Sequence, residues 1–161
     1  MPIVRQPVLK RPDEGRTLGV VGDVYRFLAT GEETNGKYAL FEALVPPGGG
    51  PPPHIHSREE ESFYILEGEL TLYLGEQRIA ARAGTFANVP VGTLHRFCNE
   101  SDKPVRLLIT VTPAGLEKMF FEIAQPVEPG ATSAPPPTAE MLAQLPAIAA
   151  KYGVEIKVPA H

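Results

Sequence analysis

The chain has 161 residues, of which 43% are hydrophobic and 21% are charged, and its net charge is −4. These values are typical of a single soluble globular domain with a real core. The absence of a basic block argues against a nucleic-acid surface, and no apolar run approaches the roughly 18 residues of a membrane span. The first sixteen residues lack the apolar stretch of a signal peptide, and there is one cysteine, so we expect a cytoplasmic protein.

The N-terminal region, residues 1–20, contains three prolines and has only weak periodicity. We expect an extended arm with a short strand at residues 3–9. The arm is either a loose terminus or a segment that pairs with the sheet of a neighbouring subunit.

Two strands are predicted next, at residues 24–29 and 38–45, because both segments are rich in β-branched, aromatic and aliphatic residues. The polar segment between them, residues 30–37, contains two glycines and is expected to be a loop. In the second strand, Phe41 belongs to an all-apolar face, which should point inward.

A run of glycine and proline at residues 46–53 leads into two histidines, His54 and His56. Proline lacks the backbone donor of a central strand, so this run should cross the barrel mouth instead. The histidines are two residues apart, and on a strand both imidazoles would point the same way. Such a pair suits Zn, Fe, Ni, Mn or Cu. The alternative is two solvent-facing histidines on a loop.

The triple glutamate that follows offers a carboxylate ligand. An unbroken strand from His56 would place Glu60 on the histidine face, but residues 57–59 resemble a turn or bulge that changes the register. Counting back from the strand beyond is safer. Glu61 shares a face with Phe63 and Ile65, so Glu61 should point inward, whereas Glu59 is expected in a solvated turn.

Short strands continue at residues 70–74, 77–82, 85–89 and 105–111, separated by glycine-containing turns. This spacing is typical of an antiparallel sandwich or barrel. His95 and Phe97 share a face of another short strand. Taken alone, His95 would more often be a core or rim histidine than a ligand.

The two halves of this region together resemble the cupin superfamily. Gly48-x5-His54-x-His56-x4-Glu61-x6-Gly68 matches the first cupin motif at every fixed position, and Gly84-x5-Pro90-x-Gly92-x2-His95-x3-Asn99 matches the second. The resemblance covers roughly residues 24–112 and implies an all-β, antiparallel jelly-roll barrel with a C-terminal helical extension. It also implies one metal held by His54, His56, Glu61 and His95. More narrowly, the chain resembles small cupins described as quercetin dioxygenase-like.

Three imidazoles and one carboxylate would leave one or two positions of a divalent ion open. The ion would be Fe, Mn, Ni, Cu or Zn. The site would be walled by apolar side chains, for which we expect Phe41, Phe63, Ile65, Phe86 and Phe97. Each of these could equally be plain barrel core.

These features favour a metal-dependent dioxygenase acting on a small phenolic or enolic substrate, with Glu61 as the catalytic base. A non-catalytic cupin that binds a small ligand is the alternative, and a metal-dependent isomerase is a weaker one. The motifs contain no second acid or base and no cationic phosphate site, which disfavours a decarboxylase or a phosphosugar isomerase. A homodimer is expected because jelly-roll edges need covering.

Beyond the barrel, the sequence predicts a helix at residues 112–123 and a second helix at residues 139–151 that Pro146 should kink or split. An edge strand is expected at residues 154–158. The resulting organisation is a barrel with its N-terminal arm and first helix (1–124), a proline-rich linker (125–137), and a helix with a terminal strand packing on the barrel (138–161). This extension either covers the barrel mouth or contacts a partner.

Overall fold

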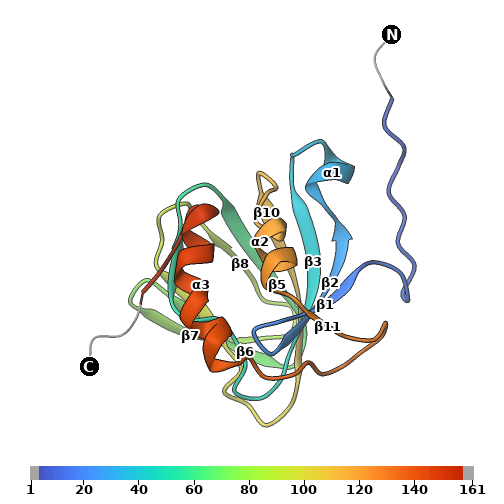
Figure 1. Cartoon of the computed structure of the whole chain (residues 1–161). Coiled ribbons are helices and arrows are strands. Elements are labelled where there is room, and N and C mark those ends of the chain that lie inside the picture. The colour runs from blue at the N-terminus through green and yellow to red at the C-terminus, as the bar shows by residue number, and fades with distance from the viewer. Residues whose placement is uncertain (1–3, 158–161) are drawn as a thin grey trace.

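The computed structural model of the protein describes residues 4–157, which are built around two antiparallel sheets (Figure 1). The larger sheet contains β1 (Thr17–Val20), β2 (Asp23–Ala29), β3 (Ala39–Val45), β5 (Glu60–Glu67), β8 (Phe86–Val89), β10 (Val105–Thr112) and β11 (Gln125–Pro126). The smaller sheet contains β4 (His54–His56), β6 (Glu69–Leu74), β7 (Gln77–Arg82), β9 (His95–Cys98) and β12 (Val154–Ile156). The strand orders are β11-β1-β2-β3-β10-β5-β8 and β12-β4-β9-β6-β7.

A single apolar core lies between the two sheets. Its composition follows from the period-two alternation of the strands, because every second side chain of β3 and β10 is fully buried. Phe41 faces Ile109 across the β3–β10 pair, and Ile109 faces Phe63 across the β10–β5 pair. The all-β antiparallel jelly roll predicted from the sequence is therefore the fold of this chain.

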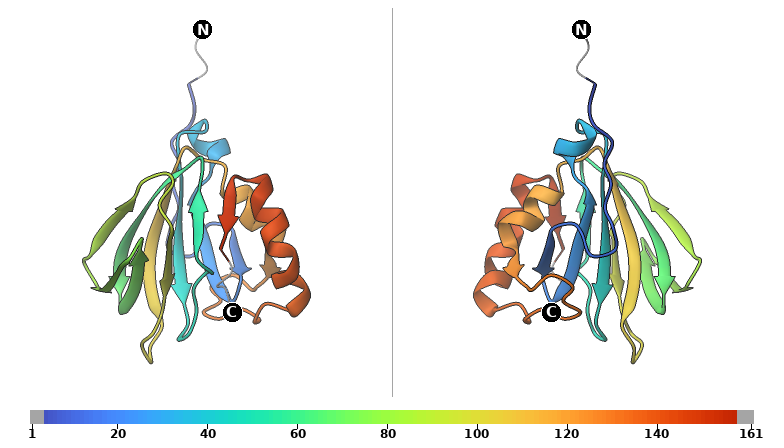
Figure 2. Two further views of the ribbon diagram at one scale, coloured as in Figure 1. Left: turned by 90° about the vertical axis from the view of Figure 1, so that its left-hand side faces the viewer. Right: turned by 90° about the vertical axis from the view of Figure 1, so that its right-hand side faces the viewer.

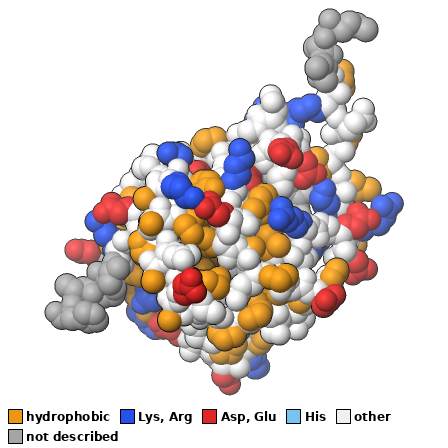
Figure 3. All heavy atoms as spheres, viewed as in Figure 1, with side chains coloured by type: hydrophobic (Ala, Val, Ile, Leu, Met, Phe, Trp, Pro, Cys, Tyr) orange, Lys and Arg blue, Asp and Glu red, His pale blue; other side chains and the backbone are white. Residues whose placement is uncertain are grey.

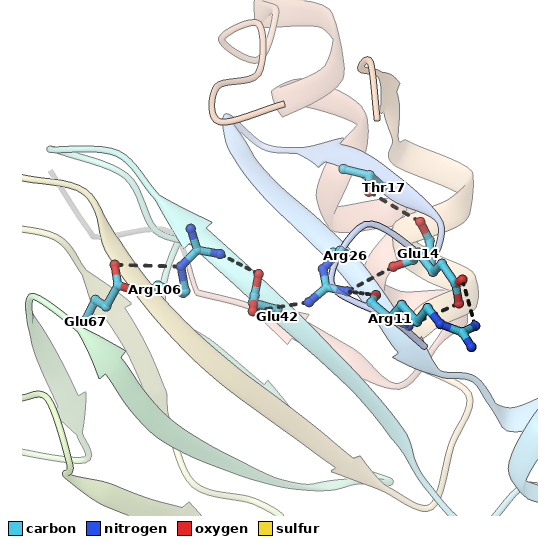
Figure 4. A network of polar contacts seen from close by, with 8 residues as sticks. Arg11, Glu14, Thr17, Arg26, Glu42, Glu67 and Arg106 are labelled. Carbon is cyan, nitrogen blue, oxygen red and sulfur yellow. Dashed lines mark hydrogen bonds and ion pairs between the residues drawn. The ribbon is translucent and has the colours of Figure 1, made fainter. Parts of the chain in front are cut away.

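The outer face of the larger sheet is polar. Figure 4 shows a row of charges that crosses four neighbouring strands, from Arg26 through Glu42 and Arg106 to Glu67, with separations of 3.5, 2.6 and 3.8 Å. These partly exposed pairs contribute little stability individually. They do fix which face of β2, β3, β10 and β5 meets water, and so which face meets the core.

Three helices complete the fold: α1 (Gly31–Thr34), α2 (Glu117–Ile123) and α3 (Ala139–Lys151). Figure 2 shows α2 and α3 lying together on one flank of the sheets. The segment expected to be a loop contains α1, where the Glu33 side chain accepts a hydrogen bond from the Thr30 backbone at 3.2 Å. The helix expected from residue 112 begins later, because β10 continues through Thr112.

Helix α3 is continuous from Ala139 to Lys151, so Pro146 does not split it. Thr138 caps its N-terminus by accepting a hydrogen bond from the Met141 backbone at 3.1 Å. Leu145 and Ala149 are buried on either side of the proline. Because tertiary packing supplies most helical stability, one missing backbone bond does not end this helix.

The expected strand at residues 3–9 is not observed over residues 4–9, and Ile3 lies outside the described residues. The arm is held against α1, where Lys10 pairs with Glu33 at 2.7 Å. The first strand is β1 instead. On the face shown in Figure 3, charged side chains of both signs are scattered among hydrophobic ones. Of the helices in residues 4–157, none is long and apolar enough to cross a membrane.

Candidate metal centre

The four predicted ligands, His54, His56, Glu61 and His95, come together inside the barrel. One ligand atom from each lies within 4.8 Å of the others, and all four side chains are buried. Two belong to β4, one to β9 and one to β5, so the cluster spans both sheets. Glu60, which an unbroken register would have selected, is exposed and accepts a hydrogen bond from Asn88 on the outer face.

Backbone contacts fix the orientation of two of the imidazoles. His54 lies opposite His95 where β4 pairs with β9. Each ring directs Nδ1 at a nearby carbonyl oxygen, that of Pro52 and that of Thr93, and both distances are 2.8 Å. A carbonyl oxygen only accepts, so Nδ1 carries the proton in both rings. The Nε2 lone pairs are then free to bind a metal.

The protonation states also suit metal binding. Burial lowers the pKa of His54 to about 4, and burial likewise lowers the pKa of His95. Both rings are therefore neutral near pH 7. Burial alone would raise the pKa of Glu61, but its close contact with His56 and the charges of the three histidines outweigh burial and lower that pKa. Burial alone would lower the pKa of His56, but its close contact with Glu61 and the charges of Glu61 and Glu59 outweigh burial and raise that pKa, so a metal ion would displace a proton from this ring. The cluster thus presents an anionic carboxylate and neutral imidazoles at His54 and His95, the ligand forms that a transition metal requires.

Buried nitrogens without hydrogen bonds mark the centre of the cluster. Nε2 of His95 and Nε2 of His56 are both buried and have no hydrogen-bond partner. The His56 atom lies 2.7 Å from Oε2 of Glu61, but the geometry is not that of a hydrogen bond. Buried polar atoms are rarely left unpartnered. A cation between these atoms would satisfy all of them, so the residues fit a metal ion.

Glu59, which was expected in a solvated turn, is 4% exposed. Its Oε2 has no hydrogen-bond partner and lies 3.7 Å from Nδ1 of His56, on the side of that ring remote from Glu61. No local pattern predicts this burial, because the turn at Ser57 and Arg58 interrupts the alternation of faces. Nδ1 of His56 is also without a hydrogen-bond partner, so Glu59 is the acidic group placed to accept its proton, and such an acceptor would orient a ligand histidine and increase its basicity.

Glu59→Gln is therefore expected to weaken metal affinity by roughly ten- to a hundredfold without unfolding the barrel, since contacts behind a ligand typically have effects of this size. Titration of metal-free protein with a competing chelator would measure it. Glu69→Gln, at an exposed glutamate of β6, is the matched control. Equal affinities for the two variants would show that Glu59 does not position His56.

A cavity of about 60 Å³ opens beside the ligands. It reaches across the barrel to β2 and is closed by the C-terminal helices; Val20, Tyr25, Met119, Phe120 and Leu145 are among the residues that line it. The extension therefore covers the barrel mouth. The cavity is smaller than the roughly 300 Å³ or more of sites for drug-sized ligands, which indicates a small substrate.

The five aromatic and aliphatic residues expected around the site fall into three groups. Phe41 and Phe97 line the cavity. Phe63 and Ile65 are buried in the core without lining it. The expectation for Phe86 is wrong: this side chain is 63% exposed and pairs with Tyr64 on the outer face, because Ala87 and Val89 occupy the inward positions of β8.

One acidic cavity residue was missed. Asp23, the first residue of β2, lines the cavity and is 2% exposed. Period-two alternation would have found it, because Asp23 shares the inward face of β2 with Tyr25 and Phe27. The cavity therefore does contain an acidic group besides the metal ligands. No Lys or Arg is among the described residues that line it.

Comparison with known proteins identifies the family. The family model "Cupin domain" matches residues 41–111, which include all four clustered side chains. Residues 41–111 form a cupin domain. This cupin is 27% identical over 122 residues, 76% of the chain, to a protein named quercetin 2,3-dioxygenase from Bacillus subtilis. The chain spans 36% to 62% of the lengths of the curated relatives that it matches.

Solved cupin structures share the fold. An RmlC-like cupin from Shewanella frigidimarina superposes with a TM-score of 0.61 at 18% identity, covering 70% of this chain and 96% of that one. A protein described as a predicted oxalate decarboxylase from Thermotoga maritima gives a TM-score of 0.55 at 23% identity, covering 56% and 80%. At these identities the likeness establishes the barrel and leaves the reaction to the site itself.

Proposed function

We propose that this cupin is a metal-dependent dioxygenase that cleaves a small phenolic or enolic substrate. The observation that carries the proposal is the buried cluster of three imidazoles and one carboxylate, of which His54, His56 and Glu61 line a largely apolar cavity. Similarity to the Bacillus subtilis protein named quercetin 2,3-dioxygenase supports the reaction class. The small cavity favours a single-ring or open-chain enol over a flavonol.

His54, His56, Glu61 and His95 would hold the ion. A divalent transition metal there supplies positive charge and open positions for substrate oxygen atoms. Glu61, which is ionised near neutral pH, accepts the proton of the enol. The phenyl rings of Phe41 and Phe97 and the helix residues Met119 and Phe120 exclude water from the reacting atoms.

Ligand binding without turnover is the alternative function, because an ion-binding cavity of this kind also suits a sensor. A phosphosugar isomerase is disfavoured, since the described cavity lining offers no cation for a phosphate group. The motifs disfavoured a decarboxylase because they contain no second acid. Asp23 supplies a carboxyl group in the cavity, so this argument against a decarboxylase no longer holds.

The test is oxygen uptake by protein loaded in turn with Fe, Mn, Co, Ni and Cu, with pentane-2,4-dione and a hydroxypyranone as probes. We expect oxygen consumption with at least one metal, and both atoms of labelled O₂ in the cleaved product. Loss of the signal in Glu61→Gln would assign it to this site. Tight binding of both probes with every metal and no oxygen uptake would favour the ligand-binding alternative.

A further inference from the structure

Asp23 is a buried acid that the proposed chemistry does not use. Its side chain lines the cavity, and Oδ1 is buried without a hydrogen-bond partner. No Lys, Arg or His nitrogen of the described chain lies within 4.0 Å of its carboxyl group, since none of the ion pairs involves it. A buried carboxyl group with an unpartnered oxygen is costly unless a ligand or a water satisfies it.

The surroundings keep this carboxyl group away from solvent. The loop that leads into β4 passes so close that a β-carbon at Gly49 would lie 2.8 Å from Oδ1. Burial raises the pKa of Asp23 to about 8. The group is therefore neutral at pH 7, and it can both donate and accept a hydrogen bond.

Asp23 lies far from the metal ligands along the same cavity. In the larger sheet β3 and β10 separate β2 from β5. The pairing of Val24 with Leu44, of Leu44 with Arg106 and of Arg106 with Glu67 places Asp23 level with the end of β5 remote from Glu61. The cavity touches both Asp23 and Glu61. It therefore has a carboxyl group in two places, and its walls are formed by apolar side chains together with Tyr25, whose phenol feels the charges of both Asp23 and Glu61.

We propose that the Asp23 carboxyl group is a second substrate-binding group, which hydrogen-bonds a hydroxyl or carbonyl group at the end of the substrate remote from the metal ligands. This inference rests on the proposed function for the placement of the enolic end. The substrate class is then a small molecule with a chelating hydroxyketone or enol at one end and an uncharged hydrogen-bonding group at the other. A neutral carboxyl group repels an anion less than a carboxylate does, but it offers no positive charge to bind one. The remote end of the substrate is therefore expected to be uncharged.

A matched pair of probes tests the proposal. Kojic acid, 5-hydroxy-2-hydroxymethyl-4-pyranone, carries a hydroxyl group across the ring from its chelating oxygens, and 5-hydroxy-2-methyl-4-pyranone lacks only that hydroxyl. Both are titrated under nitrogen into protein loaded with Co(II), whose visible spectrum reports chelation. Calorimetry gives the affinities. Because oxygen is absent, the measurement does not depend on turnover.

We expect kojic acid to bind up to about tenfold more tightly than its methyl analogue, the range for one net hydrogen bond. The preference should disappear in Asp23→Leu, persist in Asp23→Asn, and leave the cobalt content of both variants unchanged. Chelation of both probes with equal affinity by the unmodified protein would overturn the assignment of Asp23, whether or not the variants fold. Failure of both probes to alter the cobalt spectrum would overturn the proposed chelation site and this inference with it.

Discussion

Glu61→Gln is expected to remove almost all bound metal from the protein, whereas Glu60→Gln leaves metal binding unchanged. Glu61 is the one anion among three histidines in the buried cluster, and its amide replacement keeps the shape while removing the charge. Removing a metal ligand lowers metal affinity more than removing a residue that only contacts a ligand does. We therefore expect metal affinity to fall by more than about a hundredfold. Elemental analysis of protein purified without added metal should give about one ion per chain for the parent.

Glu60→Gln is a close control, because it makes the same chemical change one residue away on the exposed face of the same strand. It touches only Asn88, at the surface. Thermal unfolding of both variants in chelator would establish that each barrel remains folded. The opposite pattern, with metal lost in Glu60→Gln and kept in Glu61→Gln, would mean that the inward register of β5 is wrong by one residue.

Asp23→Asn is expected to remove a large pH dependence of stability. The pKa of Asp23 is raised by burial from 3.8 to about 8, so between these values the folded state keeps a proton that the unfolded state has lost. Because the unfolded state then binds fewer protons, the free energy of unfolding falls as the pH rises. From about pH 5 to about pH 8 this amounts to about 4 kcal/mol, at 1.36 kcal/mol per pH unit.

Urea unfolding of the two proteins in chelator, at several pH values across that window, would measure the difference. Asn cannot titrate, so the parent should lose stability relative to Asp23→Asn on going to higher pH. Tyr25, His54, His56 and Glu61 line the same cavity and are common to both proteins, so their own titrations largely cancel. Parallel stability curves would contradict a neutral, buried Asp23.

Much of the barrel is predictable because period-two alternation is a strong signal wherever one face of a strand is buried. It gave β3 and β10, and it selected Glu61 over Glu60 from the burial of Phe63 and Ile65 alone. It failed for Phe86, where the larger residue faces solvent and the smaller Ala87 faces inward. The rule identifies which residues share a face; it does not decide which of two mixed faces is the inner one.

Most of the parts that were missed depend on contacts between distant segments, and Asp23 is the exception. The burial of Glu59 is imposed by the tertiary fold around a turn, and no local pattern encodes it. Asp23 was overlooked because it begins a strand whose other inward residues are apolar, and a single polar residue there resembles a turn. The apolar stripes of α2 and α3 allow two arrangements, in which the helices either cover the barrel mouth or contact a partner. Only the packing of the folded chain decides between them.

Strand β12 has a consequence for how the protein is made. It pairs with β4 along both metal-binding histidines, Val154 opposite His56 and Ile156 opposite His54. Ser57, just after β4, bonds to the carbonyl of Gly153, 96 residues further along the chain. During synthesis, both cupin motifs are therefore translated before β12, the second of the two strands that pair with β4. The strand that carries His54 and His56 therefore has both of its sheet neighbours only after residues 154–156, which include none of the four clustered side chains, have been synthesised.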